Sequence, residues 1–295
     1  MALGNNNDLP VRLYSKQFLE ILQTVYANQA FFNDFTASGT IEALDGVKDN
    51  DAAFYVKTSD IAHVLGTYNT GANIAFGTGT SSSSRFGQMT EIIYSNIAVP
   101  YTGTWSFNEG MDRFTVNNDL SSAVADRLEL NAKQRTNLFD RVVATAMSDV
   151  ATTVPLASTT YDNILALFNT LSSNYTNLEV TGDKVAAVTP EIYNMIVDGP
   201  SNTTAKNALV SIADNNVVRF KGFEIREVPT SKMPAGTQLL TYVKGIGKAF
   251  TGISTVRTVE AIDFDGQMLQ GAGRYGTYIP LDNAKAIFKV VVPTP

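Results

Sequence analysis

Very few side chains in this sequence are of the kinds that usually carry chemistry. The 295-residue chain contains no cysteine and one histidine, His63. Without cysteine there is no disulfide, no thiolate nucleophile and no cysteine-ligated zinc, and a single histidine cannot form a metal-binding pair. His63 stands between Ala62 and Val64, with no nucleophile motif near it. We therefore expect a packed strand residue there rather than a catalytic base.

Two glycine-rich stretches are similar to nucleotide-binding loops, but neither fits the full pattern. Residues 245–249 read Gly-Ile-Gly-Lys-Ala. A phosphate-binding loop needs a further glycine upstream and Ser or Thr directly after the lysine; Tyr242 and Ala249 occupy those two positions. Residues 77–80 lie in a serine-rich stretch rather than between a strand and a helix, as a dinucleotide fingerprint requires. We expect 245–249 to be a turn between two strands.

The acidic residues do not form a recognisable site either. Residues 263–266 (Asp-Phe-Asp-Gly) resemble part of a calcium loop but lack its later ligands and closing glutamate. An Asp-Gly type I′ hairpin turn explains them better. Asp45, Asp49 and Asp51 are expected to form a solvated acidic loop. No carboxylate pair stands out among the 28 acids, so we predict no catalytic, cofactor-binding or metal-binding residue and no enzymatic activity.

Charge limits the possible partners. The formal net charge is −6, and no two of the 22 basic residues are adjacent in sequence. Tight binding to a nucleic-acid backbone needs clustered Lys and Arg, so we expect none, although a weakly acidic wall could still enclose nucleic acid. Charged residues make up 17% of the chain, below the usual quarter. A β-rich protein with many turns explains this slightly better than a surface that partners cover.

No targeting or membrane segment is expected. The stretch 1–10 (MALGNNNDLP) has neither a basic region nor an apolar region of signal-peptide type. The longest apolar runs, such as Val290–Val292, are too short to span a bilayer.

The first third of the chain predicts an arm, a helix and a ribbon. Residues 1–10 read as a flexible arm, and apolar spacing predicts a helix from Val11 to about Asn33. Residues 53–65 and 91–101 look like strands, rich in β-branched and aromatic residues, and the glycine- and serine-rich stretch 66–88 lies between them. The simplest assembly is a two-stranded ribbon with a flexible tip. Such a ribbon is marginal alone and needs a surface to lie on.

The strongest signal is a long helix over 118–151. Asn118 or Asp119 can cap it, and there is no Gly or Pro from Leu120 to Ala151. Apolar residues form a stripe along its length without a sustained heptad, so a core helix fits better than a coiled coil.

The rest of the chain predicts a mixed α/β unit followed by closing strands. Helices are expected over 160–173 and from Thr189-Pro190-Glu191, and a hairpin turns at Lys221-Gly222. Further strands are expected over 184–188, 217–228, 239–243, 249–251, 255–264, 267–278 and 284–292.

The order of these elements resembles the major capsid protein of tailed bacteriophages, the HK97-type fold family. The resemblance covers nearly the whole chain and is carried by short motifs in order: Ala187–Tyr193, Gly222–Ile225 with Val228-Pro229, Phe264–Gly266, Gly273–Pro280 and Asn283–Ile287.

The resemblance implies an α+β HK97-like capsid fold in five parts. These are an N-terminal arm with a helix (1–52), an extended β-ribbon loop with flanking strands (53–117), the spine helix of the peripheral domain (118–151), an α/β axial domain (152–260) and C-terminal strands that return to the peripheral domain (261–295).

The implied function is structural. Copies of the chain would form hexamers and pentamers of an icosahedral phage head that encloses double-stranded DNA without sequence-specific binding. The head would assemble in the host bacterial cytoplasm with portal and decoration proteins. Some family members crosslink through a lysine on the extended loop, but here no lysine lies between Lys57 and Lys133, so we expect noncovalent assembly. The arm leads directly into the fold, and we expect a separate scaffolding protein.

Other classes remain open at this point. An encapsulin-like cellular compartment shares the fold but would carry a cargo-peptide groove and lack DNA. An enzyme would need an unrecognised carboxylate site, and the ribbon disfavours a monomeric binding module.

Overall fold

The computed structural model describes residues 12–44, 52–59, 65–71, 74–75, 84–87, 89–116, 119–199, 210–213 and 216–291. The chain divides into two compact units. We call Asn50–Pro100 the ribbon unit, and Met1–Asp49 together with Tyr101–Pro295 the main unit.

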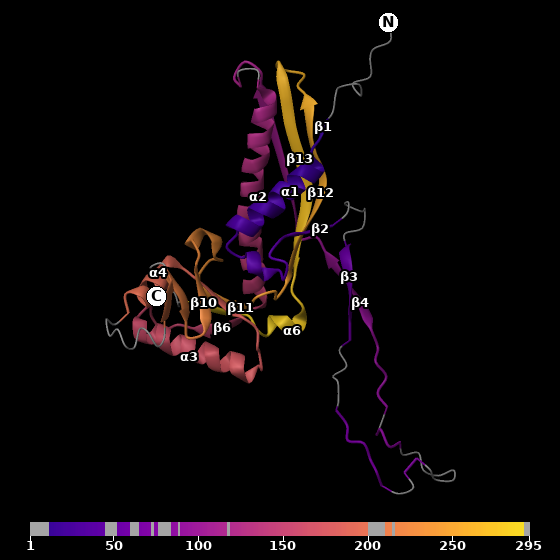
Figure 1. The fold of residues 1–295 in the computed structure, drawn as a ribbon, viewed down its shortest axis with the longest axis vertical. Helices are drawn as coiled ribbons and strands as arrows, with labels where there is room; N and C mark the ends of the chain where they lie inside the picture. Colours follow the sequence, from indigo (N-terminus) through magenta and orange to yellow (C-terminus); the bar gives the residue numbers. More distant parts are fainter. Residues whose placement is uncertain are drawn as a thin grey trace. The chain divides into compact units, whose positions relative to one another are not determined.

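The main unit is built on a single long helix, α2 (Leu120–Val150) (Figure 1). The Asp119 side chain caps it by accepting a hydrogen bond of 3.1 Å from the backbone N–H of Ser122. One face is buried along its length, from Val124 to Met147. The expected helix over 118–151 is confirmed, since neither Gly nor Pro interrupts its apolar stripe.

A long twisted sheet lies beside α2 (Figure 1). Its strand order is β1 (Arg12–Leu13), β12 (Lys248–Glu260), β13 (Gly266–Tyr278) and β5 (Gly103–Asp112), all antiparallel, with β2 (Glu42–Ala43) parallel to β12. Helix α1 (Ser15–Gln29) packs against both α2 and β12. Phe18 of α1 contacts Trp105 and Phe107 of β5, so α1 and α2 bury the inner face of this sheet.

A second, mixed sheet of seven strands makes up the other part of the main unit. Its order is β6 (Thr152–Pro155), β14 (Phe288–Val291), β11 (Thr237–Val243), β7 (Lys184–Val188), β10 (Phe223–Glu227), β9 (Asn216–Phe220) and β8 (Val210–Ala213). Its helices are α3 (Tyr161–Asn177) and α4 (Pro190–Val197), and short helical turns are η2 (Asn33–Phe35), η3 (Thr230–Lys232) and α6 (Leu281–Ala284). Aromatic contacts of Phe168 and Tyr175 bind α3 to the sheet through Phe223.

The ribbon unit contains an antiparallel pair, β3 (Ala52–Thr58) and β4 (Ser95–Pro100). The predicted ribbon is therefore present, but its strands are shorter than the expected 53–65 and 91–101. Residues 91–94, although β-branched and aromatic in part, are not in a strand.

Several local predictions are confirmed. Helix α1 falls within the expected 11–33, α3 covers the expected 160–173 from Tyr161 onward, and α4 begins with Pro190 in its first turn. The hairpin between β9 and β10 turns at Lys221 and Gly222, whose φ angles of +52° and +85° are those of a type I′ turn. The stretch 244–247 is the predicted turn between β11 and β12.

The predicted type I′ hairpin turn at Asp265-Gly266 is not formed. Strands β12 and β13 are joined by the longer loop Ala261–Asp265, and Gly266 begins β13 with φ outside the left-handed region. A Cβ on Gly266 would collide with the carbonyl oxygen of Met111. This glycine therefore serves close approach of β5 rather than a tight turn.

The extents of the strands near the end of the chain also differ from the expected ones. The stretches 249–251 and 255–264 belong largely to one strand, β12, which has a bulge between Ile253 and Thr255 and lies in the long sheet. The expected last strand 284–292 is shorter, because the α6 turn extends to Ala284, and its remainder β14 joins the seven-stranded sheet. Long-range pairing, which local patterns do not encode, decides both assignments.

Candidate assembly interface

The ribbon unit exposes large apolar side chains. Leu65 is 89% exposed, Phe86 81% and Met89 95%. In the β3–β4 ladder, the directly opposed pairs Phe54–Val99 and Val56–Ile97 alternate along the strands with Tyr55–Ala98, so they give one face an apolar character. On this face Val99 is buried and Phe54 and Val56 are half-buried, so the most exposed of the large apolar side chains are those outside the two strands. Large apolar side chains left in water mark a surface that binds another molecule.

A second candidate surface is the outer edge of the long sheet. β5 ends the strand order and, in the part of the chain that the structure describes, pairs only with β13. Its inward-facing Glu109 forms a bidentate ion pair with Arg127 of α2, with both N···O distances 2.7 Å. The Asn131 side-chain amide donates a third hydrogen bond to Glu109. The hydrogen bond from Arg127 holds the pKa of Glu109 below its usual value.

Arg135, two turns further along α2, differs from Arg127 in that it contacts an aromatic ring. Its guanidinium lies 5.4 Å from the centre of the Trp105 ring. Its Nε is buried and has no hydrogen-bond partner among the described residues, and burial lowers its pKa. Glu109 pairs directly with Arg127 and only attracts Arg135 from further away, so two cations share one acid, and no described acid lies within ion-pair distance of Arg135.

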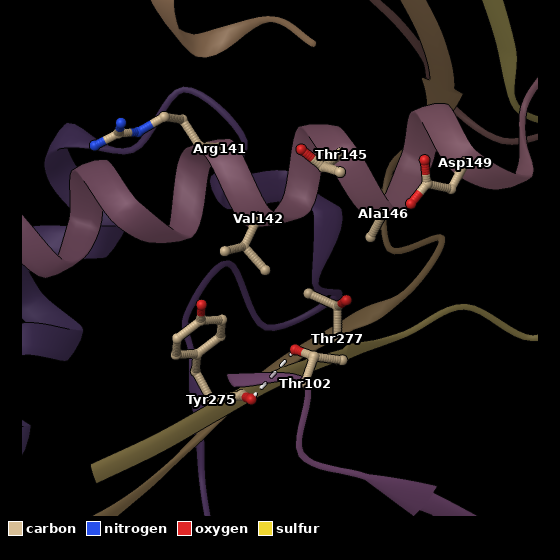
Figure 2. A pocket seen from close by; sticks show the side chains of 8 residues that line it. All are labelled: Thr102, Arg141, Val142, Thr145, Ala146, Asp149, Tyr275 and Thr277. Carbon is tan, nitrogen blue, oxygen red and sulfur yellow. Dashed lines mark hydrogen bonds between the residues drawn. The ribbon is translucent and has the colours of Figure 1, made fainter. Parts of the chain in front are cut away.

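A pocket of about 290 Å³ lies between α2 and β13 (Figure 2). Arg141 and Asp149 stand at its two ends on α2, with Val142 and Ala146 between them. On the strand side, the Thr102 hydroxyl donates to the carbonyl oxygen of Tyr275 at 3.3 Å. Figure 2 shows the two charged groups well apart, at opposite ends of the pocket.

A partly buried charge network attaches η2 to the seven-stranded sheet. Arg226 of β10 donates to both oxygens of Asp34 at 3.0 Å each and to the Phe31 carbonyl at 2.7 Å. The Tyr242 hydroxyl donates to Asp34 at 2.7 Å. The carboxylate is thus neutralised and fully hydrogen-bonded, which is the arrangement of a structural ion pair rather than of a general acid or base.

A second buried carboxylate attaches the same segment to α2. Asp140, only 1% exposed, accepts hydrogen bonds from the backbone N–H groups of Phe31 at 2.9 Å and Phe32 at 3.3 Å. The Lys232 ammonium lies 3.6 Å from its other oxygen. Burial raises the pKa of Asp140 and lowers that of Lys232.

The structure describes only some of the residues considered for chemistry in the sequence. His63, Asp45, Asp49, Asp51 and the stretch 77–80 lie outside the described residues. Lys248, the first residue of β12, pairs with Glu42. Within the described residues, no three His, Cys, Asp or Glu side chains are placed to hold a metal ion, and no helix has the length and apolar character to cross a membrane.

Sequence reasoning missed Arg135 and the two buried carboxylates. No local signal could reveal them, because Asp140 meets Phe31 across 109 residues and Arg226 meets Asp34 across 192.

The fold matches solved capsid structures over most of its length. The bacteriophage PhiM1 mature capsid matches with a TM-score of 0.62 at 11% identity, covering 90% of this chain and 87% of that one. The capsid of the cyanophage P-SCSP1u matches with a TM-score of 0.61 at 12% identity, covering 86% and 87%. A structure from Mycobacterium phage Che8 gives 0.55 at 12% identity, covering 98% and 94%.

Comparisons by sequence, in contrast to those by structure, find no match. No family model matches the chain, and no curated protein matches it by sequence. The similarity is therefore one of fold, at identities where sequence signals have faded.

Proposed function

We propose that this chain, which has the HK97-type capsid fold, is a major capsid protein that assembles into an icosahedral phage head around double-stranded DNA. The observation that carries the proposal is the ribbon unit with its exposed apolar side chains. Leu65, Phe86 and Met89 are each more than four-fifths exposed. A monomer rarely leaves such side chains in water together, whereas a shell buries them on neighbouring copies.

The parts of the fold then take the roles of a shell subunit. Residues 53–117 would form the extended loop, 118–151 the spine of the peripheral domain, and 152–260 the axial domain around the five- and six-fold positions. Because β12 pairs in the long sheet, we assign the axial role within 152–260 to the strands and helices of the seven-stranded sheet. Many weak contacts, each repeated in every copy, would add up to a stable closed particle.

The proposed partners are mainly other copies of the chain, as hexamers and pentamers. A separate scaffolding protein, a portal protein and decoration proteins complete the head, which assembles in the host bacterial cytoplasm and ends in the virion. The chain would have no enzymatic role, since its buried carboxylates Asp34 and Asp140 are tied up in structural ion pairs. It would enclose DNA without sequence-specific contacts, in keeping with its scattered basic residues and net charge of −6.

The nucleic-acid content of particles tests the viral half of this proposal. Particles purified from infected cells and treated with nuclease should retain protected double-stranded DNA. Particles of the same fold that hold a cellular protein and no DNA would instead identify an encapsulin-like compartment.

A further inference from the structure

The long sheet ends in a strand with an open edge. β5 runs from Gly103 to Asp112 and pairs on one side with β13; in the described part of the chain its other side pairs with no strand. An open edge of this length presents a row of backbone N–H and C=O groups that can template another strand. Thr104, Ser106 and Asn108 are exposed on its outer face, so the edge is not shielded there by bulky side chains.

The inner side of this edge carries a surplus positive charge. Arg127 is satisfied by Glu109, but Arg135 has no ion pair in the described part of the chain. Stacking on Trp105 holds its guanidinium in place. A fixed, partly desolvated guanidinium is preorganised to receive a carboxylate.

The ribbon unit contains a segment with the complementary features. Residues 89–94 (Met-Thr-Glu-Ile-Ile-Tyr) have strand composition but belong to no strand. Ile92, Ile93 and Tyr94 are 60%, 64% and 66% exposed. Glu91, the acidic residue of the described ribbon unit, is exposed and makes no ion pair with any described residue.

We propose that residues 89–94 of one copy add as a strand to the open edge of β5 in a second copy, where Glu91 pairs with Arg135. Strand addition would supply backbone partners to two segments that have none among the described residues on these sides. In an extended segment alternate side chains point to opposite faces. With Glu91 toward Arg135, Ile93 faces the same side, near Trp105, and Ile92 lies on the outer face beside Thr104, Ser106 and Asn108.

This inference rests on the proposed self-assembly and names the contact that makes it. Because the chain has no cysteine, any disulfide must join introduced positions, and the matching single-cysteine variants show whether two copies of the same position pair instead. Ile92→Cys should be combined in turn with Thr104→Cys, Ser106→Cys and Asn108→Cys, and assembled protein oxidised. One pair should give cross-linked multimers, from the dimer up to the closed ring, as the main species on a non-reducing gel. The control is Ile92→Cys with Ser254→Cys, on β12, since two further strand spacings put it beyond the ~7 Å Cα separation a disulfide allows.

Charge reversal tests the ion pair independently. Glu91→Arg and Arg135→Glu should each lower the yield of assembled protein about tenfold, and the double variant should recover most of it. Glu191→Arg, an exposed acid on α4, makes the same charge change elsewhere and should leave the yield unaltered.

The outcomes separate the two proposals. Assembled protein that gives no cross-link with any of the three pairs, or a disulfide that leaves the mass of a monomer, would overturn the docking and leave self-assembly standing. Cross-linking without charge rescue would retain the strand addition and refute the Glu91–Arg135 pair. A chain that stays monomeric under every assembly condition would overturn both.

Discussion

At the scale of single residues, the segment after α1 is held by buried charges on both sides. Asp140 of α2 binds the N–H groups of Phe31 and Phe32, while Arg226 of β10 binds the Phe31 carbonyl. Burying charges is costly unless each is paired. The two ion pairs therefore fix where the segment runs between α2 and the seven-stranded sheet, rather than adding much net stability.

Removing one partner of such a pair should lower the stability of the fold. Lys232 is 12% exposed and Asp140 1%, so Lys232→Met leaves a buried carboxylate without its cation. We expect the free energy of unfolding at neutral pH to fall by about 3 kcal/mol in urea denaturation. The double variant Asp140→Asn/Lys232→Met leaves no unpaired charge and should lie closer to the wild type. Equal or additive losses would contradict this view of the pair.

The stability lost in Lys232→Met should depend on pH in a defined direction. Burial raises the pKa of Asp140, so the stability linked to this group is present at low pH and is lost as pH rises through the folded-state pKa. Without Lys232 the ionised carboxylate is costlier still. The deficit of Lys232→Met should therefore be largest at neutral pH and shrink on acidification. A deficit that grows on acidification would show that the carboxylate is not the cause.

At the scale of elements, α2 is held by one buried face. Phe139 is fully buried and meets Tyr26 and Tyr275 edge to face. Leu130, on the same helix, is 47% exposed. Phe139→Ala should lower the free energy of unfolding by about 3–5 kcal/mol, and Leu130→Ala should change it by less than about 0.5 kcal/mol. Comparable losses in thermal unfolding would mean that the buried stripe does not anchor the helix.

Elements governed by local chemistry could be predicted from the sequence. Helix α2 follows from an uninterrupted apolar stripe with an Asp cap, and the turn at Lys221-Gly222 follows from the need for two positive φ angles. The predicted tight turn at Asp265-Gly266 was wrong. A glycine can permit a tight turn or the close approach of another backbone, and the sequence alone does not distinguish the two. Here it admits the Met111 backbone rather than a tight turn.

Elements governed by distant partners could not be predicted. Residues 91–94 have strand composition yet lie outside any strand, and a ladder depends on a partner segment that the composition of 91–94 does not encode. Sheet membership of β12 and β14 depends on pairing across the whole chain. The cation Arg135 was equally invisible, since its lack of an acid follows from how Arg127 and Glu109 pair.

At the scale of the whole molecule, the exposed apolar residues of the ribbon unit should matter for assembly and little for folding. Leu65→Ser with Met89→Ser should leave the unfolding free energy within about 0.5 kcal/mol of wild type, because both side chains are in water in the single chain. The same double variant should lose most assembled protein in size-exclusion chromatography. Leu281→Ser, 78% exposed in the main unit, is the matched control. Assembly that survives the double variant would remove the ribbon unit from the interface.

Assembly should also be noncovalent. No lysine lies between Lys57 and Lys133, so the stretch between the two ribbon strands has no amine to offer an amide bond. Particles boiled in detergent should run as one band near 31.9 kDa on a denaturing gel. A ladder of multiples that resists boiling would reveal a covalent link and overturn this expectation.

The central claim is that the chain builds a closed shell from copies of itself. Electron microscopy of the purified full-length chain, examined alone and with the scaffolding protein of its source if one is found, tests this most directly. The account predicts closed particles of uniform size or their ring-shaped capsomers. A field of small single molecules under both conditions, matched by a stable monomer in size-exclusion chromatography, would contradict it.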